Sequence, residues 1–106
     1  MVKMLWHGCY TVEGAKGLIK EGGTGRRKAV EQLVSSAGGK LEAIYWAFGD
    51  NDVYLIADLP DNATAASVSL AVAVAGAVEI KTVVLLTADE IDDATKKSIT
   101  YRPPGA

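Results

Sequence analysis

The stretch Leu41–Leu59, LEAIYWAFGDNDVYLIADL, decides the fold because it predicts two β-strands joined by a turn. Leu41–Phe48 and Val53–Leu59 are rich in apolar, aromatic and β-branched residues, which is typical of strands. Gly49–Asp52, which separates them, consists of turn formers, and its Asp-Asn pair can adopt positive φ angles. The centre of the chain is therefore predicted to be an antiparallel β-hairpin.

The alternation of side chains along this hairpin predicts which face is buried. With a short loop at Gly49–Asp52, the strands form three apolar pairs, namely Phe48–Val53, Trp46–Leu55 and Ile44–Ala57. Because a buried face must be apolar, we expect these pairs to meet the helices. The opposite, open face then carries a mixed set of side chains: Ala43, Tyr45, Ala47, Tyr54, Ile56 and Asp58.

Two further strands are predicted on either side of the hairpin, at Val2–Tyr10 and Val78–Leu86. Their apolar residues alternate in the same way, so each strand also has a helix side and an open side. The helix side is predicted to hold Met4, Trp6, Gly8, Val78, Ile80, Thr82 and Val84. The open side is predicted to hold Lys3, Leu5, His7, Cys9, Glu79, Lys81 and Val83.

The segments between the strands have helical patterns. Thr11–Glu21 predicts a short helix, Gly22–Gly25 a break, and Gly25–Ala37 a longer helix with one apolar stripe. Asp61 is a suitable N-cap for an alanine-rich helix over Ala63–Ala75. Helices therefore lie before the second strand and before the fourth.

A last helix and a tail follow the fourth strand. Thr87–Glu90 has the spacing of a capping box, and Lys96 and Lys97 close the helix that it opens. Ser98–Ala106 reads as an extended tail, in which Tyr101 is expected to pack on its own or a neighbouring subunit.

The order of elements predicts an α+β, ferredoxin-like βαββαβ domain: a four-stranded antiparallel sheet with helices on one face, then a C-terminal cap helix and an extended tail. A chain of 106 residues with 49% hydrophobic residues suits one domain, here residues 1–106, of which 98–106 form the tail.

Composition excludes several classes of partner. The net charge is −2 and no long basic run occurs, so neither nucleic acid nor an acidic membrane surface is an expected partner. The most apolar stretch, Ala63–Val78, is shorter than a spanning helix. Cys9 is the only cysteine, so no disulfide forms within the chain. With no signal-peptide pattern in Met1–Tyr10, we expect a cytoplasmic protein.

Several of these stretches resemble the GYD-domain family. They are Tyr10–Gly14 with Gly17 and Leu18, Ala47–Val53, Leu70–Gly76, and Lys81–Thr82 with Leu85–Thr87. The resemblance covers about residues 4–98. It implies a ferredoxin-like fold of the dimeric α/β-barrel type and no particular activity. The family is named for a Gly-Tyr-Asp motif, and Asn51 stands here where the Tyr would be, so a role for that Tyr is not carried over.

The open sheet face is the predicted ligand site. It should bring together His7, Tyr45, Tyr54, Asp58 and Lys81 beside the apolar Leu5 and Ile56. An apolar pocket with a few convergent polar groups is the usual form of a small-molecule site. His7 is the best candidate for a general base, with Asp58 or a tyrosine hydroxyl to orient it. The alternative is that these groups satisfy one another across a subunit interface.

Other candidate sites have weaker patterns. His7 and Cys9 share a strand face and could form an activated thiolate, although a Cα separation of about 6–7 Å is loose for a direct hydrogen bond; the alternative is a buried thiol and a hydrogen-bonded histidine. No metal-binding spacing occurs, and no cofactor is indicated, although a haem on His7 is conceivable from the fold. A glycine-rich loop at a helix N-terminus could hold an anion through Gly23, Thr24, Gly25, Arg26 and Arg27, the alternative being a flexible break with solvated arginines.

Two functions from different classes remain open. The first is a small-molecule-binding protein or enzyme whose pocket on the open face is closed by a partner subunit. The second is a non-catalytic regulatory or assembly module that oligomerises through that face. Both predict a homo-oligomer, because the uncovered face would expose the apolar Leu5, Ile56 and Val83.

Overall fold

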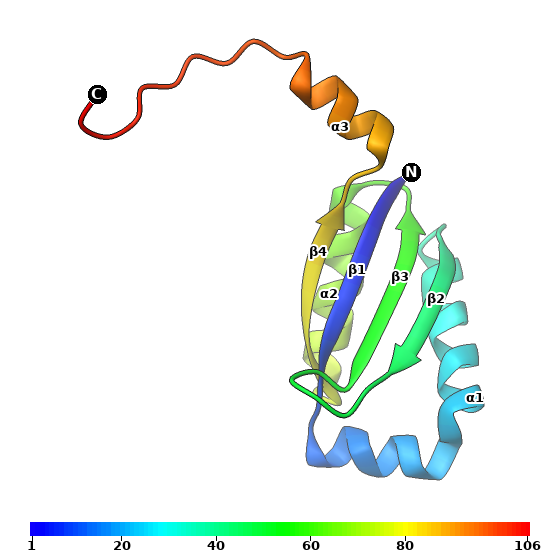
Figure 1. Cartoon of the computed structure of the whole chain (residues 1–106). Coiled ribbons are helices and arrows are strands. Elements are labelled where there is room, and N and C mark those ends of the chain that lie inside the picture. The colour runs from blue at the N-terminus through cyan, green and yellow to red at the C-terminus, as the bar shows by residue number, and fades with distance from the viewer.

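Four strands form one antiparallel sheet in the computed structural model, which describes residues 1–106 (Figure 1). The strands are β1 (Val2–Tyr10), β2 (Lys40–Trp46), β3 (Val53–Leu59) and β4 (Val78–Leu85). Their order across the sheet is β2-β3-β1-β4, so β1 and β3 are central and β2 and β4 are the edges. This α+β arrangement is consistent with the predicted ferredoxin-like fold.

Two helices, α1 (Val12–Ser36) and α2 (Asn62–Ala75), cover one face of the sheet and leave the other open (Figure 1). The main part of α1 packs on β2, and α2 packs on β4. Between helices and sheet lies the core cluster, which consists of Met4, Trp6, Val34, Ala57, Leu59, Ala65 and Val68. The helix side and open side of β1 and β3 are thus those that alternation predicted.

A single residue divides α1 into two helical segments. Gly22 has φ 75° and ψ 169°, a backbone conformation that glycine adopts at little cost. The predicted break at Gly22–Gly25 is therefore confirmed but is narrower than expected. The first segment runs along the lower end of the sheet, and the second rises behind β2 (Figure 1). Another positive φ, 79° at Gly38, ends the second segment.

The register of the central hairpin differs from the prediction by two residues. Val53 pairs with Trp46 instead of Phe48, and Leu55 pairs with Ile44. The connecting loop is longer than a hairpin turn, and none of its residues has a positive φ. An even shift keeps every side chain on its predicted face because the side-chain period of a strand is two. A β-bulge between Leu41 and Ala43, near the start of β2, then shifts the register by one residue, so that Leu41 pairs with Ala57.

Phe48 was predicted to face the helices, and this is wrong. β2 ends at Trp46, and Phe48 lies fully exposed in the loop that follows. The loop leaves the sheet early because its later residues bond to β1, as described below. Val84 is also half exposed, although its partner Met4 is buried, because β4 is an edge strand that α2 covers only in part.

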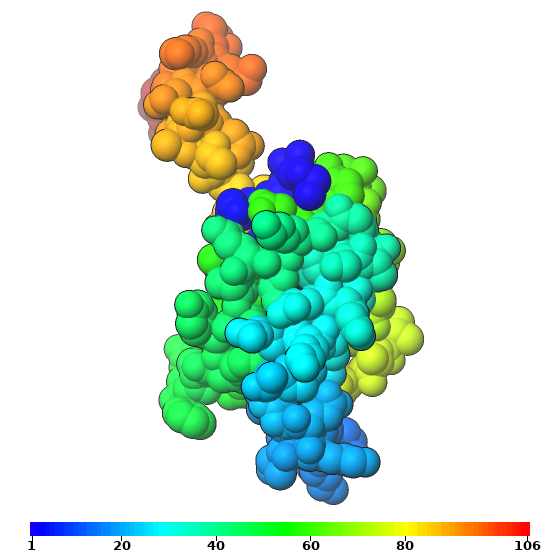
Figure 2. Space-filling view, turned by 90° about the vertical axis from the view of Figure 1, so that its right-hand side faces the viewer, coloured from blue at the N-terminus to red at the C-terminus, as the bar shows by residue number.

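The C-terminal part of the chain stands away from the sheet. The predicted capping box opens α3 (Ala88–Thr95), with both reciprocal bonds between Thr87 and Glu90 present. No residue of α3 is buried, so this helix does not cap the domain as expected. Figure 2 shows the segment clear of the body. It raises the radius of gyration to 16.8 Å, whereas a compact chain of this length has about 13 Å.

No helix of the chain combines the length and the apolar character that crossing a lipid bilayer requires.

The close approach of α1 to the connection between α2 and β4 gives a first prediction. A Cβ on Gly14 would lie 1.7 Å from the carbonyl oxygen of Ala77, whereas one on Gly17 would meet nothing within 4 Å. Gly14→Ala should therefore destabilise the fold by about 1–3 kcal/mol, as overpacking does. Gly17→Ala, its control in the same helix, should stabilise it by about 0.5–1 kcal/mol through helix propensity. Urea unfolding measures both, and equal stabilities would contradict the packing.

Candidate functional site

Four side chains form a straight row across the open face of the sheet. Tyr54 on β3 lies opposite Tyr45 on β2 and opposite His7 on β1, and His7 lies opposite Lys81 on β4. Adjacent strands are about 4.8 Å apart, so neighbours in the row are within reach of one another. The structure therefore brings together four of the five residues expected at this site, one from each strand.

His7 and Tyr54 are in direct contact within this row. Their rings stack with centroids 6.0 Å apart and an angle of 18° between planes. The Nδ1 atom of His7 lies 3.1 Å from Oδ1 of Asn51, and Nδ2 of Asn51 lies 3.5 Å from the hydroxyl of Tyr54. One amide side chain thus bonds to both rings of the stack, with its oxygen placed toward His7 and its nitrogen toward Tyr54.

Asn51 reaches His7 because the loop between β2 and β3 passes across the lower end of β1 (Figure 1). The backbone N–H of Asp52 donates to the carbonyl of Gly8 at 2.8 Å, and the backbone N–H of Tyr10 donates to a carboxylate oxygen of Asp52 at 2.9 Å. The first of these bonds continues the ladder between β1 and β3 by one residue before β3 begins. Both bonds hold the preceding residue, Asn51, over the open face, where it is half-buried.

The orientation of the Asn51 amide bears on which atoms of His7 and Tyr54 donate and which accept hydrogen bonds. With the amide oxygen toward His7, a neutral His7 ring carries its proton on Nδ1 and leaves a lone pair on Nε2. Because the Nδ2 group donates to the oxygen of Tyr54, the hydroxyl proton of Tyr54 is free to point elsewhere. The site therefore offers one acceptor, one donor and, from Lys81, one cation to a bound molecule.

Asp58 does not orient His7, so that part of the expectation is wrong. It lies opposite Lys3 on β1, four residues from His7. The ammonium of Lys3 is 3.0 Å from Asp58 and 2.7 Å from Glu42. Hydrogen bonds to Glu42 and Asp58 raise the pKa of Lys3 above its ordinary value. The bulge at the start of β2 explains this pairing, because it brings Glu42 to the open face beside Lys3.

An apolar row separates the His7 row from the Lys3 ion pairs. Leu5 on β1 lies opposite Ile56 on β3 and Val83 on β4, and Ile56 lies opposite Ala43 on β2. Leu5 and Ile56 are half-buried and Val83 is 39% exposed, since no element of the chain covers this face. The open face is thus apolar in the middle and polar in the rows on either side.

Cys9 is tied to the loop. Its thiol donates to the carbonyl of Asp50 at 3.1 Å, whereas His7 bonds to Asn51, so the two side chains do not bond to each other. No group of three or more His, Cys, Asp or Glu side chains is placed to hold a metal ion.

The glycine-rich segment that was considered for anion binding lies just after the bend in α1. Gly23, Thr24 and Gly25 form the first turn of the second helical segment. Of the two arginines, Arg27 lies 3.5 Å from Glu31 and is exposed, whereas Arg26 lies 3.6 Å from Glu21 and lines a cavity on the helix side. The two guanidinium groups thus lie in different surroundings, and anion binding by this segment stays a prediction.

Comparison with known proteins supports the resemblance found in the sequence. The family model described as GYD domain matches residues 5–95. No curated protein matches the chain. The sequence pattern predicts only a turn former at Asn51 and misses its contact with His7. The family resemblance was the one feature that could have drawn attention to this position. By that resemblance, Asn51 stands where the family's motif has a Tyr, and it lies beside the strand that carries the candidate base.

The tautomer of His7 gives a second prediction. His7 is the only histidine, so its ring nitrogens give a single set of NMR signals. At a pH where His7 is neutral, the ring should carry its proton on Nδ1. Asn51→Ala should shift the population toward the Nε2–H form because the acceptor for Nδ1 is lost.

Asn62→Ala is the control, since Asn62 begins α2 on the other side of the sheet. It should leave the tautomer unchanged. A wild-type protein that already has its proton on Nε2 would contradict the placement of the Asn51 amide oxygen toward His7.

Proposed function

The chain belongs to the GYD-domain family, and we propose that it binds a small molecule on its open sheet face, in a pocket that a second copy of the chain closes. The observation that carries this proposal is the His7–Asn51–Tyr54 network. A histidine that is hydrogen-bonded through Nδ1 and lies on an uncovered sheet face beside an apolar row is suited to ligand binding or proton transfer.

A second subunit supplies the cover that the open face lacks. The apolar row on this face consists of Leu5, Ile56 and Val83. In a twofold dimer, this row packs against the same row of the other copy. Packing of two such sheets face to face gives the dimeric α/β barrel that the family resemblance implies. The polar rows then lie at the rim of the interface, where a ligand enters between the sheets.

The free groups of the site favour a ligand with an acidic hydroxyl, such as a phenol or an enol. The Nε2 atom of His7 can accept the hydroxyl proton, and Lys81 on the neighbouring strand can stabilise the resulting oxyanion. Tyr54 donates a further hydrogen bond, and Tyr45, 72% exposed, offers an aromatic surface at the edge of the row.

The second candidate function is a non-catalytic assembly module, and the projecting C-terminal segment favours it. Ile91, Ile99 and Tyr101 are exposed there at 46%, 80% and 67%. A helix of eight residues is marginal by itself, so α3 gains stability by packing on another copy of the chain. The two functions differ in one respect: only the first requires His7 for binding.

The oligomeric state gives a third prediction. Wild-type protein at micromolar concentration should be a dimer or a larger oligomer in light scattering coupled to size exclusion. Ile56→Glu should dissociate it, because the charge would be buried at the centre of the interface. Leu70→Glu places the same charge on the outer surface of α2, where Leu70 is 67% exposed, and should leave the oligomer intact. A wild-type monomer, or equal behaviour of the two variants, would contradict the interface.

Binding of a coloured phenol gives a fourth prediction. p-Nitrophenol should bind saturably, and its absorbance should shift toward the phenolate because His7 accepts the proton. His7→Gln and Lys81→Met should each weaken binding about tenfold, the effect of losing roughly 1.4 kcal/mol.

Lys40→Met is the matched control for Lys81→Met, since Lys40 lies opposite Asp58 in a different row. Equal affinity in wild type, His7→Gln and Lys81→Met would leave the assembly module as the better function.

A further inference from the structure

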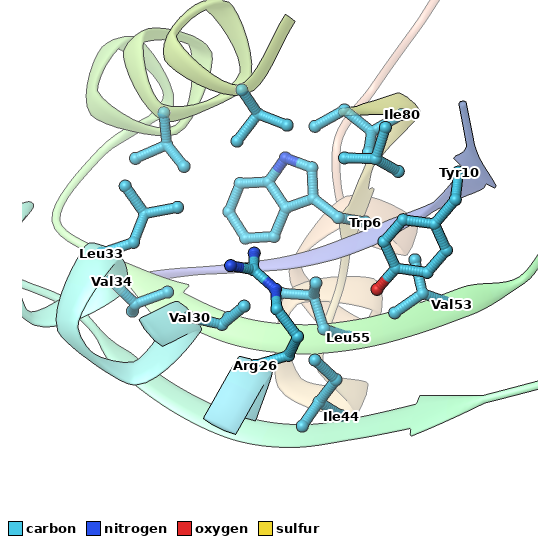
Figure 3. Close-up of a pocket in the computed structure, with 13 residues that line it drawn as sticks. Trp6, Tyr10, Arg26, Val30, Leu33, Val34, Ile44, Val53, Leu55 and Ile80 are labelled. Atoms are coloured by element: carbon cyan, nitrogen blue, oxygen red, sulfur yellow. The ribbon is translucent and has the colours of Figure 1, made fainter. Parts of the chain in front are cut away.

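An apolar cavity lies on the other side of the sheet, between α1, α2 and the strands (Figure 3). Its volume is about 80 Å³, and 12 of its 13 lining residues are hydrophobic. Trp6 from β1 forms part of its wall, held by a hydrogen bond from its indole N–H to Ser69 at 2.9 Å. This space is separated from the His7 site by the sheet itself.

The cavity lies between two helices that pack on opposite edges of the sheet. The main segment of α1 packs on β2 and α2 packs on β4, so the centre of the sheet is covered from two sides. The residues that α2 contributes to the wall, Val68 and Val72, are too small to fill the space between the helices. A groove between α1 and α2 shares Leu33 and Val68 with the cavity and so adjoins it.

Arg26 is the one charged residue that lines this cavity. Figure 3 shows its guanidinium group directed into the cavity, toward Trp6. Its nearest carboxylate oxygen, on Glu21, is 3.6 Å from Nη1, which is too long for a hydrogen bond. The side chain is 35% exposed, and none of its donors makes a hydrogen bond within the protein. A cation with free donors therefore stands beside an apolar space.

We propose that this cavity binds an alkyl carboxylate, with the carboxylate on Arg26 and the chain beside Trp6. Arg26 provides paired N–H donors that match the two oxygens of a carboxylate, and Glu21 occupies that position loosely when the ligand is absent. The cavity is smaller than the ~150 Å³ space that holds a benzene ring, so a narrow chain fits better than a ring. A longer chain continues into the adjoining groove.

Octanoate, below its micelle concentration, is the probe that tests this site by isothermal titration calorimetry. Wild-type protein should bind it saturably with one site per chain, and Arg26→Gln should weaken binding at least tenfold. Arg27→Gln is the matched control, because Arg27 is the next residue in the same helix and does not line the cavity. Glu21→Gln should strengthen binding, since it removes the competing carboxylate.

A spectroscopic measurement locates the ligand. In a Trp46→Phe background, Trp6 is the only tryptophan, and its emission should change on addition of octanoate with the affinity that calorimetry gives. Octanol, which has the same chain without the charge, should bind at least tenfold more weakly. Equal affinities of Arg26→Gln and Arg27→Gln, or octanol binding as tightly as octanoate, would overturn the proposal. Binding that leaves Trp6 emission unchanged would also overturn it.

Discussion

The alternation of side chains along β1 is the constraint on which the rest of the structure depends. β1 pairs with β3 on one side and β4 on the other, so its register fixes which face each neighbour buries. Trp6 points into the core while His7, the next residue, points to the open face. Because successive residues of a strand face opposite ways, one strand contributes a wall to the helix-side cavity and a ring to the open site.

The loop between β2 and β3 turns the open face into a site. The backbone N–H of Asp52 donates to the carbonyl of Gly8, and the carboxylate of Asp52 accepts from the N–H of Tyr10, so these two polar groups of β1 are satisfied just before β3 begins. The same anchoring holds Asn51 against His7 and Tyr54. The same loop is longer than a tight hairpin turn and leaves Phe48 exposed. Apolar burial is therefore lost at Phe48, while the amide of Asn51 is held in a defined position.

The molecule leaves apolar side chains exposed on the open sheet face and along the C-terminal segment. The row of Leu5, Ile56 and Val83 has no cover, and the C-terminal segment extends the chain to 56 Å along its longest axis. Both features involve surface that would be buried by another copy of the chain. In the proposed dimer, the interface and the ligand site would therefore be built from the same strands.

The sequence by itself determined the elements, their order and the face of nearly every strand residue, because these depend on local periods of two and 3.6 residues. The prediction of faces survived a two-residue error of register, since an even shift returns each side chain to the same side. Only the tertiary structure decided the register, the contact between Asn51 and His7, the pairing of Asp58 with Lys3 and the inward turn of Arg26. Each of these joins residues far apart in the chain or depends on where the helices lie on the sheet, and no local sequence pattern encodes such contacts.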